Sequence, residues 1–143
     1  MAHDFKRFPE LTNSQMDIYY FQSPHKQITD DFRAKVVKVT DGDTIRVTCD
    51  FRDFSFPIRF ADLAAPELNE AGGVESRNWL KSKIEGEEVD IEITPQRVEK
   101  WGRLLAKVFF RGMNLAEESV TMGKSVSWED RDLNNWGLKW EFQ

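Results

Sequence analysis

Hydrophobic and polar residues alternate in three short segments of the first half of the chain, which is the pattern of β-strands with one buried face. The segments cover residues 33–40, 44–49 and 54–60. In the middle segment the apolar side chains occupy every second position: Ile45, Val47 and Cys49. Asp41-Gly42, between the first two segments, favours a tight turn. The pattern therefore predicts a β-hairpin followed by a third strand.

The second half of the chain adds two helices and two strands. Helical patterns cover about residues 74–85 and 115–122, and Asn114 can cap the second helix. Alternating residues predict strands over 89–93 and 104–110. The order β-β-β-α-β-β-α predicts a mainly β fold with helices (α+β), in the form of a five-stranded barrel with packed helices.

The two ends of the chain differ from this central part, which we place at residues 32–128. Residues 1–31 are predicted to be an N-terminal helical extension, because Thr12 and the polar residues after it can cap a short helix. Residues 129–143 are a C-terminal tail that, together with Trp128 directly before it, is rich in aromatic residues: Trp128, Trp136, Trp140 and Phe142. Such side chains could cover the barrel, bind a partner or stack on nucleic-acid bases.

Composition limits the classes of protein to which the chain can belong. Its 143 residues, of which 40% are hydrophobic, suffice for one core without disulfides or structural metals. The single cysteine, Cys49, excludes an intrachain disulfide and an ordinary cysteine-based zinc site. Neither a membrane-length apolar run nor a secretory signal is visible, so a cytoplasmic location is expected. The net charge of −5 argues against a protein that coats DNA through bulk positive charge.

Three polar segments at the ends of predicted strands carry residue types suited to phosphate chemistry. They are Asp41-Gly42-Asp43-Thr44, the stretch from Arg59 to Pro66-Glu67, and Lys100-Trp101-Gly102-Arg103. Their order and spacing resemble the thermonuclease, or staphylococcal-nuclease-like, family over about residues 32–128. The resemblance implies a five-stranded OB-fold barrel with packed helices, and a calcium-dependent nuclease that cleaves DNA and RNA.

The resemblance further implies that Arg59 and Arg103 bind the scissile phosphate and that Glu67 activates the attacking water. These residue types suit the reaction, because a phosphodiester anion repels a nucleophile unless positive charge lies on its oxygens. Guanidinium groups bind phosphate through two parallel hydrogen bonds and stay protonated. Lys100 and Trp101 stand where the family usually has a basic residue and a tyrosine, near the terminal phosphate of a bound nucleotide.

A site for Ca²⁺, or for Mg²⁺, is also implied, with Asp43 as a metal-binding carboxylate and Asp41 as its acidic neighbour. Oxygen ligands without histidine or cysteine suit these hard cations better than zinc. The sequence departs from the family at Ala64, where a second metal-binding carboxylate is usual. If the strand pleat continues, Asp62 lies on the same face as residue 64. Asp62 or Asp41 could then reach the ion, directly or through water.

Two functions of different classes are compatible with these residues. The first is a metal-dependent nuclease that hydrolyses phosphodiester bonds of DNA or RNA with little sequence specificity. The alternative is a catalytically weakened nuclease-like OB-fold module that binds nucleic acid or protein. Ala64 favours the module. The presence of a general base, Glu67, together with both arginines favours the enzyme, because a binding module has no need of a base.

Overall fold

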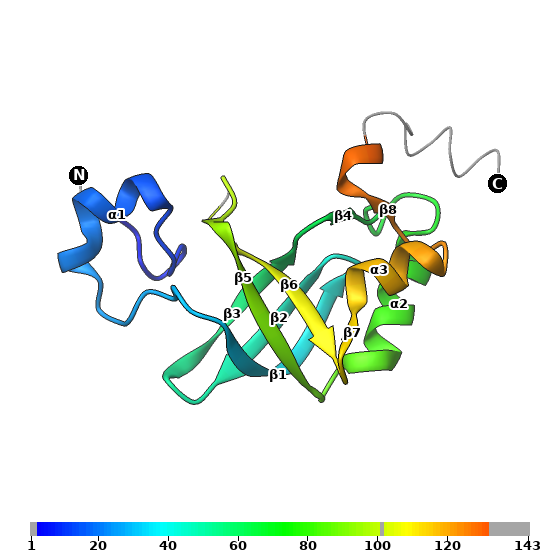
Figure 1. The fold of residues 1–143 in the computed structure, drawn as a ribbon, viewed down its shortest axis with the longest axis horizontal. Coiled ribbons are helices and arrows are strands. Elements are labelled where there is room, and N and C mark those ends of the chain that lie inside the picture. The colour runs from blue at the N-terminus through cyan, green and yellow to red at the C-terminus, as the bar shows by residue number, and fades with distance from the viewer. Residues whose placement is uncertain (1–2, 101, 132–143) are drawn as a thin grey trace.

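Five strands close into a barrel in the computed structural model, which describes residues 3–100 and 102–131 (Figure 1). The strands are β1 (Phe32–Asp41), β2 (Thr44–Cys49), β3 (Arg52–Phe60), β5 (Glu88–Val98) and β6 (Leu104–Phe110). β1 pairs with β2 and β5, β2 pairs with β3, and β5 pairs with β6, all of them antiparallel. β3 and β6 pair in parallel, which closes the sheet. The closed barrel confirms the predicted α+β fold of the OB type.

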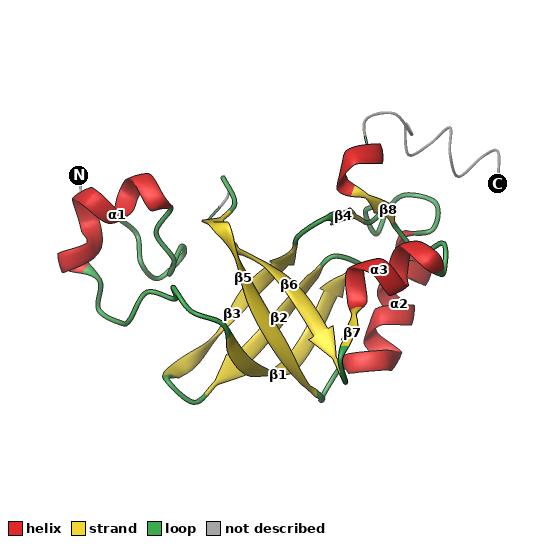
Figure 2. Cartoon of the chain, in the orientation of Figure 1, coloured by secondary structure: helices red, strands yellow, loops and turns green. Residues whose placement is uncertain are grey.

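The described residues also form three α-helices and several short elements outside the barrel (Figure 2). They are α1 (Asn13–Tyr19), η1 (Tyr20–Gln22), β4 (Leu63–Ala64), α2 (Gly73–Ile84), β7 (Met113–Asn114), α3 (Leu115–Thr121), β8 (Val126–Ser127) and η2 (Trp128–Asp130). α2 packs against β1, α3 packs against β6, and β4 pairs with β8. The predicted cap of α3 is present, since the Asn114 side chain accepts hydrogen bonds from two backbone amides of its first turn. No described helix is long and apolar enough to cross a membrane.

Alternate residues of each strand fill the barrel interior. Phe56, Ile58 and Phe60 of β3 are each at most 1% exposed, whereas Arg59 lies between them on the other face of the strand. Full burial of such a side chain contributes roughly 1.5–3 kcal/mol, so the interior holds the sheet closed. The alternation of apolar and polar residues in the sequence thus identified the strands, because alternate side chains point to the inside and the outside of the barrel.

One strand extends beyond its predicted end. β5 does not stop at Thr94-Pro95 but continues to Val98, with an interruption of its pairing with β6 between Ile93 and Val98. Such a bulge accommodates Pro95, which has no N–H for the ladder. Arg97 has a positive φ of 65° within the bulge. Its side chain therefore leaves the strand in a direction that regular pleating would not give.

The N-terminal extension contains the predicted capped helix. The Thr12 hydroxyl accepts a hydrogen bond from the Gln15 amide, and the Gln15 side chain accepts one from the Thr12 amide, at 3.2 and 3.0 Å. This is a capping box, which satisfies two amides that the helix leaves unpaired. The extension also contributes to the protein interior, because Leu11 and Ile28 are 0% and 2% exposed. The aromatic residues predicted for the C-terminal tail, Trp136, Trp140 and Phe142, lie outside the described residues.

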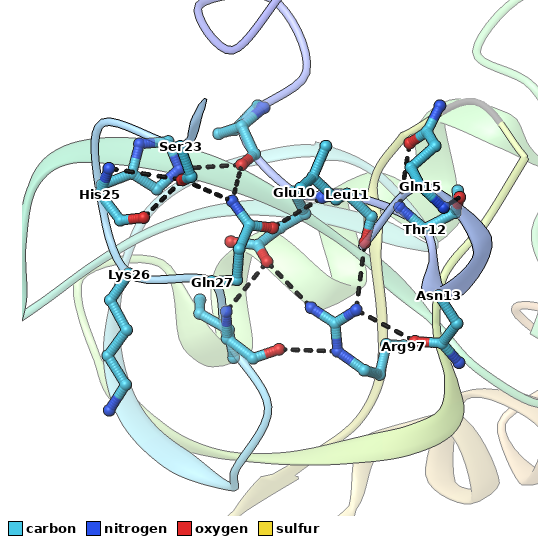
Figure 3. Close-up of polar contacts among 12 residues, drawn as sticks. Glu10, Leu11, Thr12, Asn13, Gln15, Ser23, His25, Lys26, Gln27 and Arg97 are labelled. Carbon is cyan, nitrogen blue, oxygen red and sulfur yellow. Dashed lines mark hydrogen bonds and ion pairs between the residues drawn. The ribbon is translucent and has the colours of Figure 1, made fainter. Parts of the chain in front are cut away.

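A buried ionic cluster around Glu10 fastens the extension to the barrel (Figure 3). The Glu10 carboxylate, 2% exposed, pairs with Arg52 of β3 and with Arg97 of β5, the latter at 3.3 Å. It also accepts a hydrogen bond from the Ile28 amide at 3.0 Å. Because an unpaired charge is costly in a protein interior, each member of the cluster depends on the others.

Replacement of Glu10 by alanine should destabilise the protein by about 3–5 kcal/mol, since two buried guanidinium groups lose their counter-charge. Urea unfolding followed by circular dichroism measures this change. The matched control is Glu88→Ala, which removes one partner of an exposed pair with Arg33 at 4.0 Å and should cost no more than about 1 kcal/mol. Equal stability of the two variants would contradict a structural role for the cluster.

Candidate active site

The turn between β1 and β2 is held tightly against α2. The Asp43 amide donates a hydrogen bond to Asp41 Oδ1 at 3.1 Å, which fixes the turn locally. Gly42, at its tip, is buried, and a Cβ at this position would lie 2.0 Å from the Ser76 hydroxyl of α2. Only glycine fits this approach. The two aspartates therefore have a fixed place at one end of the barrel.

Asp43 connects the turn to the end of β3 and to the segment after β4. Its Oδ1 accepts a hydrogen bond from the Thr44 hydroxyl at 3.1 Å. Its Oδ2 accepts one from the Ala65 amide at 3.1 Å and lies 3.3 Å from Nη2 of Arg59. The Asp43 carboxylate is thus oriented by three neighbours, and it places Arg59 beside it.

The carboxyl group of Asp41 lies in surroundings that disfavour its charged form. Its pKa is raised from 3.8 to about 7, first by burial, then by the adjacent carboxyl group of Asp43, with a smaller contribution from the charge of Glu67. The Glu67 carboxylate is therefore within electrostatic reach of the turn. Because folding raises this pKa, the folded chain binds the Asp41 proton more tightly than the unfolded chain does. The corresponding stabilisation is present at low pH and is lost as the pH rises from about 4 to about 7.

Arg59 has little freedom in this structure, because its side chain is only 11% exposed. Nη1 donates to the carbonyl oxygens of Phe60 and Leu63 at 2.5 and 3.1 Å, while Nη2 faces Asp43. The guanidinium also lies 5.5 Å from the ring centroid of Trp128, within the range of a cation–π contact. These contacts fix both the position and the plane of the guanidinium.

Arg103 approaches the same turn from the start of β6. Nε and Nη2 each donate to one oxygen of the Glu99 carboxylate at 3.0 Å, and Nη1 donates to the Thr44 hydroxyl at 3.2 Å. The pKa of Arg103 is raised, mainly by the hydrogen bonds to Glu99 and also by the charges of Asp43 and Asp41. Arg59 and Arg103 therefore both lie beside the acidic turn, one next to Asp43 and the other next to Thr44.

Glu67 lies on the loop that leads from β4 to α2. Its amide donates to Glu70 Oε1 at 2.7 Å, and its side chain is exposed. Gly73 allows the loop to fold onto the start of α2, because a Cβ there would lie 1.8 Å from the Glu67 carbonyl oxygen. The Glu67 carboxylate is therefore accessible to solvent on the loop that leads into α2.

Asp62 is not positioned as the sequence suggested. β3 ends at Phe60, and Asp62 has a left-handed backbone with φ of 71°, so the strand pleat does not continue to Ala64. The Asp62 carboxylate is 65% exposed and lies 3.9 Å from Nζ of Lys107. Ala64 is buried in β4, where it pairs with Val126. The expectation that Asp62 and residue 64 share one strand face is therefore wrong, whereas a role of Asp62 in holding a metal ion stays a prediction.

The described residues do not include any group of three or more histidine, cysteine, aspartate or glutamate side chains arranged to hold a metal ion. The oxygen donors gathered at the turn are the carboxylates of Asp41 and Asp43. Lys100 is exposed at the β5–β6 loop, and Trp101, the other predicted nucleotide-binding residue, lies outside the described residues.

An open groove of about 670 Å³ begins at Arg59 and runs between β3, the β5–β6 loop and η2. Cationic and aromatic side chains line it, including Lys100, Lys107 and Trp128. Trp128 is 45% exposed, and its backbone amide donates to the Asp62 carbonyl oxygen at 2.9 Å. Beside Arg59 the lining of the groove thus combines cationic, aromatic and acidic side chains.

Sequence reasoning did not identify Glu99 as a site residue. Glu99 orients Arg103, and its spacing of four residues from Arg103 was the available signal. Trp128 was among the aromatic residues expected to cover the barrel, bind a partner or stack on bases, but its contact with Arg59 joins two distant parts of the sequence, so no local pattern could predict it.

Comparison with known proteins shows that the sequence of this chain is similar to the sequences of nucleases. No family model matches the chain. It is 37% identical over 79 residues to a micrococcal nuclease of Shigella flexneri, covering 55% of this chain and 43% of that protein. It is 34% identical over 100 residues to an uncharacterized endonuclease of Escherichia coli O157:H7, covering 69% of this chain and 63% of the relative. An uncharacterized endonuclease of Haemophilus influenzae is 28% identical over 96 residues, or 66% of this chain and 52% of the relative.

The chain thus spans between about two fifths and two thirds of the length of the curated relatives it matches. The aligned parts are long enough to include most of the barrel, whose closed five-stranded form agrees with the family's fold. On the strength of this similarity, the chain belongs to the thermonuclease-like family.

Proposed function

We propose that this chain is a metal-dependent nuclease that hydrolyses phosphodiester bonds of DNA or RNA with little sequence specificity. The observation that carries the proposal is the meeting of Arg59 and Arg103 with the Asp41–Asp43 turn at one end of the barrel. The names of its relatives, a micrococcal nuclease and uncharacterized endonucleases, support the same reaction class.

The two arginines would bind the scissile phosphate. A guanidinium has five N–H donors, more than the contacts of either arginine use, so phosphate oxygens can be bound without loss of the present partners. The positive charge of both groups offsets the charge that develops on the phosphoryl oxygens during attack. Because Glu99 and Asp43 hold the two guanidinium groups in place before substrate arrives, little reorganisation is needed at that moment.

Glu67 would act as the base that accepts a proton from the attacking water. Its carboxylate is exposed and contributes to the raised pKa of Asp41, which supports a base near the acidic turn. A general base typically contributes about 10² to 10⁴-fold to a rate. In this proposal the base would stand near the cationic groups that bind the phosphate, as in-line attack by water requires.

The donor set at the turn fits a hard divalent cation, Ca²⁺ or Mg²⁺. Asp41 and Asp43 would hold it, and a bound cation would offset the burial and the neighbouring carboxylates that raise the pKa of Asp41. The cation would supply Lewis-acid stabilisation of the phosphoryl oxygens. With two protein carboxylates, most of the coordination falls to water and substrate oxygens, so we expect a weak site in the free protein.

Low sequence specificity follows from the kind of contacts that the groove offers. Lys100 and Lys107 can contact phosphates, which are the same in every sequence, and Trp128 can stack on any base. The acidic turn and the two arginines would contact only the sugar-phosphate backbone of the nucleic acid. We therefore expect the substrate to be a single strand, whose bases are free to stack.

The second candidate function is a catalytically weakened module that binds nucleic acid or protein. Ala64 is the observation that favours it, because the family's usual carboxylate is absent at this position. The described residues also lack a group of three metal-binding side chains. Binding through the groove would persist in such a module, since it does not need the ion.

Degradation of single-stranded DNA or RNA should require added divalent metal, with calcium more effective than zinc. Gel assays with calcium, magnesium, zinc or excess chelator test this expectation. Full activity in chelator would contradict the metal-dependent mechanism. Absence of cleavage with every metal, together with binding of the strand, would favour the module.

Glu67→Gln should lower kcat about 10² to 10⁴-fold with little effect on substrate affinity, because it removes the base and keeps the shape. Arg59→Lys and Arg103→Lys should also lower kcat, because a point charge does not replace the guanidinium fork. Arg33→Lys, at an exposed position on β1, is the matched control and should leave kcat unchanged. Wild-type rates in all three site variants would show that the site is elsewhere.

Ala64→Asp should tighten calcium binding by about tenfold, because ligand charge is a main determinant of calcium affinity. Position 64 directly precedes Ala65, whose amide is bonded to Asp43, but it is only 6% exposed. The new carboxylate should therefore also lower the melting temperature without calcium, and calcium should restore it. Calorimetric titration and thermal unfolding measure the two effects.

Ala64→Asn is the control of equal size without charge, and it should not tighten calcium binding. Asp62→Ala should leave calcium affinity unchanged, since its carboxylate faces Lys107. A strong loss of affinity in Asp62→Ala would show that Asp62 does reach the ion when it is bound.

A further inference from the structure

We infer that residues 8–13, which we call the N-terminal arm, position Arg103 for its role in the reaction. The arm contacts the β5–β6 hairpin on both sides of Glu99, the residue that orients the Arg103 guanidinium. This inference rests on the proposed function, because it concerns the rate of that reaction. It assigns a catalytic purpose to a segment that lies outside the barrel.

The first contact is made through Arg97, which lies in the bulge of β5 two residues before Glu99. Its side chain is directed to the N-terminal extension and is almost entirely buried. All of the acceptors around its guanidinium come from that extension: the carbonyl oxygens of Ile28 and Leu11 at 2.9 and 3.0 Å, Asn13 Oδ1 at 3.1 Å and Glu10 Oε2 at 3.3 Å (Figure 3). The N-terminal extension, with the arm as its main part, therefore helps to fix the conformation of the bulge.

Two further contacts lie on either side of Arg97 along the chain. Asn13 Nδ2 donates to the Pro95 carbonyl oxygen at 3.0 Å. Phe8 packs against Gly102, where a Cβ would lie 2.7 Å from a ring carbon of Phe8. Gly102 has φ of 87°, which favours glycine, so the turn of the hairpin can approach the ring closely. The arm thus holds the hairpin before and after Glu99.

The orientation of Arg103 depends on this hairpin. The Glu99 amide donates to the Arg103 carbonyl oxygen, and the Gly102 amide donates to the Glu99 carbonyl oxygen, each at 2.9 Å. The Glu99 carboxylate then holds the Arg103 guanidinium through two hydrogen bonds of 3.0 Å. Movement of the hairpin would carry Glu99 and Arg103 with it. The end of a hairpin beyond the core opens easily unless another segment packs on it.

A displacement of about 1 Å in a catalytic group can lower a rate by as much as about 10²-fold. The contact of Phe8 is the most suitable one to remove, because it lies outside the buried cluster around Glu10. Its loss should loosen the hairpin and leave the barrel intact. A purely structural role for the arm predicts the opposite, namely lower stability without a specific effect on Arg103.

The experiment compares Phe8→Ala with Phe21→Ala, a control that removes the same side chain from a 97% exposed position of the same extension. Phe8→Ala should lower kcat about tenfold, change KM by less than about twofold and leave the melting temperature within a few degrees of wild type. Phe21→Ala should match wild type in all three measurements. Phe8→Tyr, which keeps the ring, should restore kcat. An unchanged kcat in Phe8→Ala would overturn the inference.

The double variant Phe8→Ala/Arg103→Lys tests whether the arm acts through Arg103. If it does, Phe8→Ala should cause little further loss once Arg103 has been replaced, because the group that it positions is gone. An undiminished tenfold loss in the Arg103→Lys background would show that the arm acts elsewhere, and would overturn the inference.

Hydrogen exchange provides a readout that does not depend on activity. The amides of Glu99 and Gly102 are bonded within the hairpin, so their exchange rates report its opening. Exchange at both amides should be at least about tenfold faster in Phe8→Ala than in wild type or Phe21→Ala. If wild type is inactive with every metal, the proposed function fails while this measurement still decides whether the arm holds the hairpin. Unchanged exchange would overturn the positioning role itself.

Discussion

The parallel pairing of β3 with β6 is the contact on which the candidate site depends. In this pairing Arg59 lies opposite Leu105, and Ile58 lies opposite Leu104. Arg103 directly precedes Leu104, so the closure brings the two arginines to the same end of the barrel. Parallel neighbours require a long connection, and here α2, β5 and the loops between them provide it. Without the closure, Arg59 and Arg103 would belong to opposite edges of an open sheet.

The two arginines at this end of the barrel do not fully compensate the negative charge of the acidic side chains beside them. Arg59 and Arg103 offset two carboxylates, but Asp41 still has a pKa near 7, because burial and its two acidic neighbours disfavour its charged form. A group of this kind lowers the stability of the unliganded protein at neutral pH, and natural sites retain such groups where a ligand compensates them. Asp43 differs from Asp41 in having Thr44, Ala65 and Arg59 as partners. The turn therefore combines one carboxylate that has several hydrogen-bond and ionic partners with one whose charged form its surroundings disfavour.

The sequence was sufficient for the strands, the two later helices and the capped helix α1, because each produces a local periodicity or a cap signal. The motif segments of the site were also visible, since each joins a strand end to a turn. The position of Asp62 was not predictable in this way. The left-handed backbone of Asp62 itself, two residues after Phe60, ends the strand pleat. The alternation of the preceding residues does not predict this conformation.

Contacts between distant segments were equally inaccessible. Glu10 gives no local sign that it will meet Arg52 and Arg97, because these partners lie on β3 and β5, which the closed barrel brings near each other through their common neighbour β6. For the same reason, the N-terminal extension looked like an appendage in the sequence, although Leu11 and Ile28 are buried in the structure. The pattern of apolar residues indicates which side of a helix or strand is buried. It does not indicate which other element covers that side.

The bulge in β5 illustrates how one irregular position can couple two parts of the molecule. In a regular strand successive side chains point to opposite faces, so the Arg97 side chain would point either into the barrel or into solvent. Neither environment offers its guanidinium a fixed set of hydrogen-bond acceptors. With φ of 65°, the residue instead points to the extension and finds carbonyl, amide and carboxylate oxygens there. A positive φ costs about 1–3 kcal/mol for a residue with a side chain, so the bulge persists only because those partners stabilise it. The conformation of the hairpin that carries Glu99 and Arg103 is therefore set jointly by the barrel and by a segment that the barrel fold alone does not require.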